Sequence, residues 1–150
     1  MAKKQPESNE YFMYHNPNPK GKNTSDCVIR AIAISEGKSW NDILIELCEI
    51  ARRTGYMVND RKCYEKYLTA HGYVKCKQPR KPDGKKYTGR EFCDYVLDLE
   101  QKGEITTPVI AHIGSHHLTA FVHDIICGVR CHDTWDTTSR CVGNYWYKDC

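Results

Sequence analysis

The sequence lacks the long apolar segments that mark membrane-spanning and secreted proteins. No stretch approaches the roughly 18 consecutive apolar residues that a transmembrane helix needs. The polar start over residues 1–9 has no apolar segment of the kind found in a secretory signal. The absence of internal repeats and low-complexity segments is typical of one domain with one core. These features predict a cytoplasmic protein that does not associate with membranes.

The cysteines form no Cys-x-x-Cys motif, and their number, nine, excludes complete internal disulfide pairing. Disulfides are rare in the cytoplasm, so most of these residues are expected to be reduced thiols that pack as small apolar side chains. Zinc is an alternative, because five potential ligands cluster late in the chain: Cys127, Cys131, His132, Cys141 and Cys150. The Cys-x3-Cys-His spacing is irregular for a predicted strand, whose neighbours point to opposite faces. We therefore expect neither a metal nor a cofactor.

The positive charge is concentrated in one segment. Residues 75–90 hold seven basic side chains and a single acidic one, Asp83, so their net charge is +6 within a total of +3. Prolines and glycines in the same segment predict an exposed loop. This basic loop is compatible with simple solvation or with docking of an acidic protein partner. Only one aromatic residue, Tyr87, lies among the charges, which does not favour nucleic acid.

Helix signals precede strand signals along the chain. Residues 1–22, with Asn16-Pro-Asn-Pro19, predict an irregular N-terminal arm, followed by a single domain over residues 23–150. Asp26 is expected to cap an apolar, buried helix from Cys27 to Gly37. Further helices are expected from Ser39 to Gly55, over about residues 60–70, and from Thr88 to Gly103, and strands over residues 107–113, 117–123, 129–134 and 140–146. This order predicts an α+β fold in which N-terminal helices pack against a C-terminal antiparallel sheet.

Three residues are candidates for nucleophilic catalysis. Cys27 is expected in the first turn of its helix, where unpaired N–H groups favour a thiolate. A hairpin of the second and third strands brings His117 and Asp133 together at one edge of the sheet. This is the arrangement that Cys-His-Asp catalysis needs, with the backbone N–H of Cys27 and the side-chain amide of Asn23 as candidate oxyanion donors.

Neighbouring residues leave alternatives open. His116 competes with His117, although it is expected on the opposite strand face. Asp136 competes with Asp133, although its setting is typical of a turn. Aromatic residues near the end of the chain are interpreted as core or cleft-wall side chains: Trp135, Tyr145, Trp146 and Tyr147.

Three short strings resemble the papain-like cysteine peptidases, and in particular their small bacterial and phage members related to the double-glycine leader peptidases. They are Thr24-Ser-Asp-Cys-Val-Ile-Arg-Ala-Ile32, His117-Leu-Thr-Ala-Phe121 and Asp133-Thr-Trp-Asp136. The resemblance implies a papain-like fold with Cys27 as nucleophile, His117 as base and Asp133 as the residue that orients it. It departs at two positions, because Gly21 and Val28 stand where these peptidases commonly have glutamine and glycine.

The expected function is that of a cytoplasmic thiol hydrolase, in the host cytoplasm if the chain is phage-encoded. Such an enzyme cleaves an amide bond, peptide or isopeptide, in a peptide or protein through an acyl-enzyme intermediate. The alternative is a catalytically inactive binding module on the same fold, which acts on a host protein through the basic loop.

Overall fold

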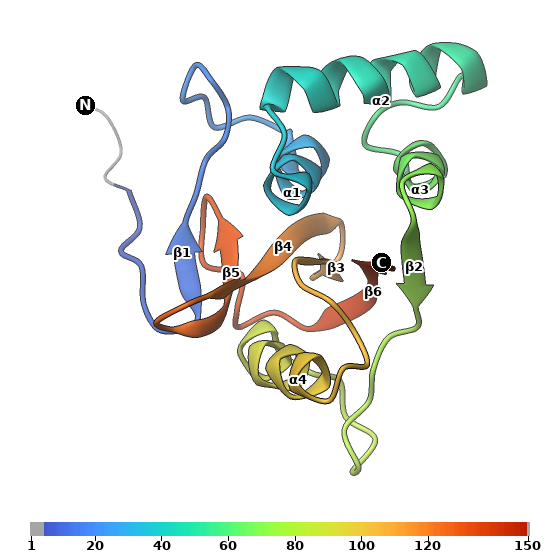
Figure 1. Ribbon diagram of the computed structural model, residues 1–150. Helices are drawn as coiled ribbons and strands as arrows, with labels where there is room; N and C mark the ends of the chain where they lie inside the picture. Colours follow the sequence, from blue (N-terminus) through green and yellow to red (C-terminus); the bar gives the residue numbers. More distant parts are fainter. Residues whose placement is uncertain (1–4, 150) are drawn as a thin grey trace.

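A six-stranded mixed sheet lies between two helical layers in the computed structural model, which describes residues 5–149 (Figure 1). The elements follow the chain as β1 (Phe12–Tyr14), α1 (Cys27–Glu36), α2 (Trp40–Thr54), α3 (Arg61–Ala70), β2 (Tyr73–Cys76), α4 (Gly89–Gln101), β3 (Val109–Ile113), β4 (His117–Asp124), β5 (Gly128–Asp133) and β6 (Val142–Lys148). The strand order is β1-β5-β4-β3-β6-β2. β1 pairs in parallel with β5, and the remaining pairs are antiparallel. The predicted α+β class is confirmed.

The helices begin and end close to the residues that the sequence indicates. Gly37 and Gly55 follow α1 and α2 in the left-handed conformation, with φ of 65° and 81°, which glycine adopts without steric cost. The Ser39 side chain accepts a hydrogen bond from the backbone N–H of Asp42 at the start of α2. Thr88 forms the predicted capping box at the start of α4. Local signals therefore determine the ends of these helices.

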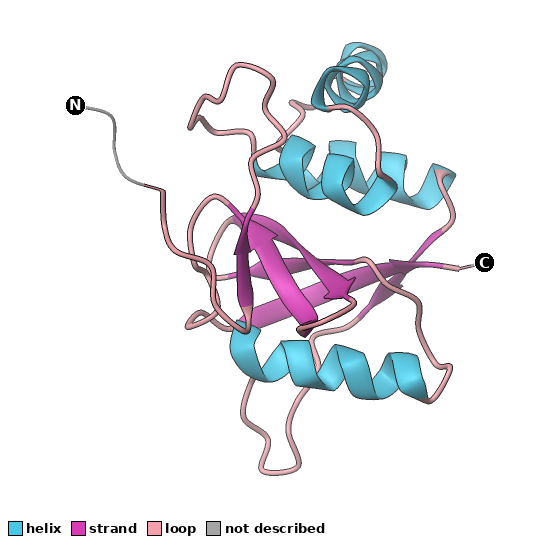
Figure 2. Cartoon of the chain, turned by 60° about the vertical axis from the view of Figure 1, so that its left-hand side comes forward, coloured by secondary structure: helices cyan, strands magenta, loops and turns pink. Residues whose placement is uncertain are grey.

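Helices α1, α2 and α3 cover one face of the sheet, and α4 covers the other (Figure 2). α1 packs against β4 and is buried along its first six residues after Cys27, as its apolar sequence predicts. On the other face, Phe92 of α4 packs edge-on against Phe121 and Tyr145 of the sheet. The two cores hold α1 and α4 on opposite faces of one sheet. Trp146 is buried in the core under α1 to α3, and Tyr145 is buried in the core under α4 with Tyr147 packed against it, so these three aromatics belong to the two cores.

The N-terminal segment is more ordered than the sequence indicates. The prediction of an irregular arm over residues 1–22 is wrong at residues 12–14, which form β1 and pair with the end of β5. Phe12 is completely buried, and Tyr14 lies beside Asp133 in the ladder. The four C-terminal strands pair antiparallel, as predicted, and β1 adds one parallel pair that was not predicted. β1 is thus the edge strand of the sheet and covers the free side of β5, the strand that ends at Asp133.

The basic loop of residues 75–90 connects β2 to α4 and projects on the α4 side of the sheet (Figures 1 and 2). Lys75 belongs to β2, where it pairs with Glu65, and Lys81 pairs with Glu91 of α4. A bridge between Arg80 and Lys86 closes the tip. The loop is therefore exposed, as predicted, and also internally ordered. Over residues 5–149, no helix has both the length and the apolar character to span a membrane.

Candidate active site

The ends of α1, β4 and β5 bring Cys27, His117 and Asp133 together. Cys27 is the first residue of α1, His117 is the first residue of β4, and Asp133 is the last residue of β5. The antiparallel pairing of β4 with β5 places their outer ends at one edge, and α1 packs across β4. The structure thus gathers the three residues that the sequence singles out.

His117 and Asp133 form a short, sheltered hydrogen bond. His117 Nε2 lies 2.6 Å from Asp133 Oδ2, and the Asp133 side chain is 1% exposed. Burial lowers the pKa of His117, but the hydrogen bonds and charges of Asp133 and Cys27 outweigh it and raise that pKa to about 9. Burial likewise opposes ionisation of Asp133, yet His117 and Arg30 hold its pKa below the ordinary value. At neutral pH this pair is an imidazolium and a carboxylate.

The Cys27 thiol lies in a setting that favours its ionised form. Burial raises its pKa. Hydrogen bonds from the His117 side chain and the Leu118 backbone, together with the charges of His117 and Arg30, lower its pKa by more than burial raises it. The net effect is a pKa below the ordinary cysteine value. Because Nε2 of His117 faces Asp133, its Nδ1 is the nitrogen left for the thiol.

Four other thiols are shifted in the opposite direction. Burial raises the pKa values of Cys63, Cys76, Cys93 and Cys131, and that of Cys131 reaches about 12. These side chains pack against the helices and the sheet as small apolar groups. Their environments favour structural packing, in contrast to that of Cys27.

Asp26 precedes α1 but does not cap it with its side chain. The predicted cap is wrong in this respect, because no first-turn N–H is bonded to the carboxylate. Asp26 Oδ1 instead accepts from Arg30 Nε at 2.8 Å, and Oδ2 accepts from Trp40 Nε1 at 2.9 Å. Arg30 in turn donates through Nη1 to Asp133 Oδ1 at 2.7 Å. A buried chain of charges therefore runs from the start of α1 to His117.

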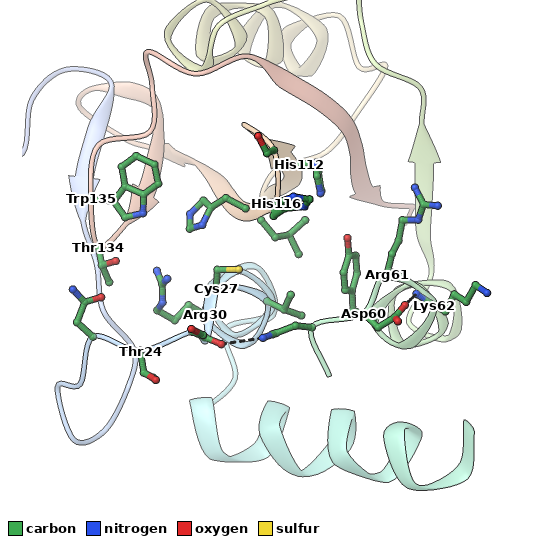
Figure 3. Close-up of a pocket in the computed structure, with 18 residues that line it drawn as sticks. Thr24, Cys27, Arg30, Asp60, Arg61, Lys62, His112, His116, Thr134 and Trp135 are labelled. Atoms are coloured by element: carbon green, nitrogen blue, oxygen red, sulfur yellow. Dashed lines mark hydrogen bonds between the residues drawn. The ribbon is translucent and has the colours of Figure 1, made fainter. Parts of the chain in front are cut away.

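A cavity of about 800 Å³ opens beside Cys27 (Figure 3). The Cys27 sulfur points into it, with Trp135 on one side and Arg61 of α3 on the other. Its lining residues are Asn23, Thr24, Ser25, Cys27, Val28, Arg30, Asn59, Asp60, Arg61, Lys62, Tyr64, His112, Ser115, His116, His117, Leu118, Thr134 and Trp135. The cavity is large enough for a short segment of peptide.

Trp135 is a cleft-wall residue, as predicted. Its ring centre lies 5.3 Å from that of His117, and 41% of the residue is exposed. The indole therefore shields one side of the imidazole from water. Trp135 also lies within cation–π distance of Arg140, whose guanidinium carbon is 6.0 Å from the ring centre.

Asn23 lines the same cavity as Cys27, on an exposed loop before α1. Cys27 and Val28 of the first turn of α1 line the cavity, and the Asp26 side chain makes no hydrogen bond to the N–H groups of this turn. Asn59 donates to the Ser25 carbonyl at 3.1 Å and so anchors this loop to the turn before α3. Asn23, the predicted oxyanion donor, thus lines the same cavity as the Cys27 thiol.

The competing residues occupy other positions. His116 lies in the turn before β4 and lines the cavity, whereas His117 is the histidine hydrogen-bonded to Asp133. The expectation that His116 would lie on the opposite face of a strand is wrong, since it precedes the strand. Asp136 accepts from the backbone N–H of Thr138 at 2.9 Å, which is a turn role, as predicted.

The late cysteines and histidine are dispersed in the described part of the chain. Cys127 and Cys141 are exposed, Cys131 is buried, and His132 is bonded to Asp124 and His15. Cys150 lies outside the described residues. Residues 5–149 contain no group of three or more metal-ligand side chains.

Sequence reasoning missed Arg30 and the part played by the N-terminal segment. Arg30 interrupts an apolar helix, and a charged residue in a buried helix requires partners, which was the available signal. Asn18 is buried and donates to Asp26 at 3.4 Å, and the backbone N–H of His15 donates to the Asp133 carbonyl at 2.9 Å. No signal of comparable strength marks these contacts in the sequence.

No family model, no curated protein and no solved structure matches the chain.

Proposed function

We propose that the chain is a thiol hydrolase with a papain-like arrangement, which cleaves an amide bond in a peptide or protein. The observation that carries this proposal is the pairing of a cysteine of lowered pKa with a histidine whose Nε2 lies 2.6 Å from a buried carboxylate, beside a cavity of about 800 Å³. A structural thiol needs none of these features. The resemblance of the strings around Cys27, His117 and Asp133 to papain-like peptidases points the same way.

The chemistry follows from the charges. The Cys27 thiolate attacks the substrate carbonyl carbon, and the carbonyl oxygen takes the negative charge near the first-turn N–H groups of α1 and Asn23. The His117 imidazolium gives its proton to the leaving nitrogen, so the amine departs and a thioester to Cys27 remains. Neutral His117 then removes a proton from water, whose oxygen attacks the thioester carbonyl. Collapse of this intermediate releases the acid and the Cys27 thiolate, which is paired again with protonated His117.

Selective alkylation tests the nucleophile without a known substrate. At about pH 6, a thiol of ordinary pKa near 8.5 is almost fully protonated, so a low-pKa cysteine reacts faster with iodoacetamide. We expect Cys27 to be labelled ahead of the exposed residues Cys48, Cys127 and Cys141, which serve as internal references. Peptide mapping by mass spectrometry gives the site of labelling. Equal, slow labelling of all four cysteines would argue against a hydrolase.

A second candidate function is a binding module that uses the basic loop. Lys77, Arg80, Lys85 and Lys86 are exposed, and within residues 5–149 none has a carboxylate within 4 Å. The loop projects from the face opposite α1, so an acidic protein can dock there without covering Cys27. Tyr87, its aromatic residue, is packed against Tyr95, which does not favour base stacking.

Two variants separate the candidate functions. Charge reversal at Lys85 and Lys86 should abolish capture of an acidic protein if the loop is the functional surface, and Cys27→Ala should leave that capture intact. For the hydrolase, Cys27→Ala should abolish turnover and retain substrate from a lysate, whereas the loop variant should cleave normally. Loss of cleavage in both variants would connect the loop to substrate recognition.

A further inference from the structure

We propose that Arg30 is a positioning residue that prepares both the histidine side and the oxyanion side of the Cys27 site. Arg30 lies on α1, three residues after Cys27, and its side chain is 6% exposed. Its guanidinium lies between two carboxylates, with Nε 2.8 Å from Asp26 Oδ1 and Nη1 2.7 Å from Asp133 Oδ1. The inference rests on the proposed hydrolase function and assigns a role to a buried charge outside the three reacting residues.

On the histidine side, Arg30 determines which way the Asp133 carboxylate faces. Asp133 Oδ1 accepts from Arg30 and from the backbone N–H of Thr134, both at 2.7 Å. Two donors on one oxygen hold the plane of the carboxylate, so Oδ2 remains directed at His117 Nε2. A charge-assisted bond of this kind is stronger than a neutral one and is buried here, which limits rotation.

On the oxyanion side, Arg30 keeps a negative charge away from the start of α1. Asp26 occupies the N-cap position, where an aspartate side chain ordinarily accepts a first-turn N–H. Here Arg30 and Trp40 hold its two oxygens, and no capping bond forms. Cys27 and Val28 of the first turn line the cavity, and the N–H groups of this turn have no side-chain acceptor. A carboxylate bonded to them would compete with the developing oxyanion and repel it.

Arg30 also affects the pKa of the Cys27 thiol through the balance of charges in the cluster. With Cys27 as thiolate, the buried cluster holds three negative groups, Cys27, Asp26 and Asp133, and two positive groups, Arg30 and His117. Removal of Arg30 leaves His117 as the sole cation for three anions. The thiolate is then less favourable, so the thiol pKa rises.

The test compares four proteins by the pH dependence of Cys27 alkylation. Arg30→Met alone leaves two buried carboxylates without their cation and endangers folding, so it is combined with Asp26→Asn, which removes one charge of each sign. Asp26→Asn alone is the matched reference, because it keeps the bond from Arg30 to Asp133. Arg130→Met is a second control, since it removes a half-buried arginine whose partner, Asp124, lies outside the cavity.

We expect the double variant to fold with native circular dichroism and to alkylate at about pH 6 about tenfold more slowly than Asp26→Asn, which corresponds to a rise of about one pKa unit. The Arg130→Met control should remain within about twofold of the wild type, and Asp26→Asn should alkylate at least as fast as the wild type, because it removes an anion from the cluster around the thiolate. A folded double variant with the same pH profile as Asp26→Asn would overturn the proposed role of Arg30. An unfolded double variant would also overturn it, because it would show that Arg30 is needed for the stability of the fold. If the wild-type protein were labelled at Cys27 no faster than at its exposed cysteines, the hydrolase proposal would be wrong, and this inference would be wrong with it.

Discussion

Replacement of Asp133 by asparagine should remove most of the stability that the fold gains from the positive charge of His117. Asparagine keeps an oxygen that can accept from His117 but removes the negative charge 2.6 Å from Nε2. Arg30 retains Asp26 as an anionic partner, so the variant should still fold. Burial opposes the imidazolium, and without Asp133 the pKa of His117 should fall from about 9 toward 6.5 or below.

The magnitude follows from linkage. Because the pKa of folded His117 lies above its unfolded value of 6.5, its stabilising contribution is complete below about pH 6.5 and is lost as the pH rises through about 9. That rise in pKa corresponds to about 3 kcal/mol, which is the net of favourable contributions from Asp133 and Cys27 and the opposing contribution of burial. The difference in unfolding free energy between wild type and Asp133→Asn should therefore shrink by about 3 kcal/mol between pH 6 and pH 10.

Urea unfolding followed by tryptophan fluorescence measures this difference at several pH values, and NMR of labelled histidine follows the His117 titration directly. Asp124→Asn is the matched control, because it removes a carboxylate 2.9 Å from a different histidine, His132, and should leave the His117 titration unchanged. A stability difference that stays constant over this pH range would refute the reasoning. So would an unshifted His117 titration in Asp133→Asn.

Two further substitutions test the framework that holds the site. Phe12→Ala empties a fully buried position of β1 and should lower the free energy of unfolding by about 3–5 kcal/mol in urea titration; a loss below about 1 kcal/mol would mean that β1 is not part of the cooperative fold. Thr88→Ala removes the capping box of α4 and should cost about 1 kcal/mol in the same measurement. Because α4 lies on the face opposite α1, Thr88→Ala should leave Cys27 alkylation unchanged, and a change would contradict that separation.

The sequence predicts most of the helices and the four C-terminal strands because their signals are local. Gly37 and Gly55 end helices through a backbone conformation that few other residues adopt, and Ser39 and Thr88 begin helices through bonds within one turn. His117 and Asp133 could be placed together because one hairpin determines both positions. These inferences need no knowledge of distant contacts.

The two outer strands depend on partners far along the chain. Phe12 pairs with Cys131, and Tyr73 pairs with Lys148, so neither β1 nor β2 is joined to its neighbour by a short turn. β1 has three residues and β2 has four, which is too short for a clear alternation of apolar and polar side chains. β1 and β2 are held in place by their pairing with β5 and β6. Local sequence patterns therefore do not predict that β1 lies beside Asp133.

Competition between two partners explains why Asp26 does not cap α1. An N-cap side chain contributes about 1 kcal/mol to a helix. Arg30 is buried at 5% exposure, and removing one partner of a buried ion pair costs about 3–5 kcal/mol. The larger penalty determines the structure, so the Asp26 carboxylate turns to Arg30 and the first-turn N–H groups stay open. The sequence shows that Asp26 is able to cap and that Arg30 requires an anion, but the fold decides which requirement is met. For the proposed hydrolase, the absent cap is the feature that leaves the first-turn N–H groups available to an oxyanion.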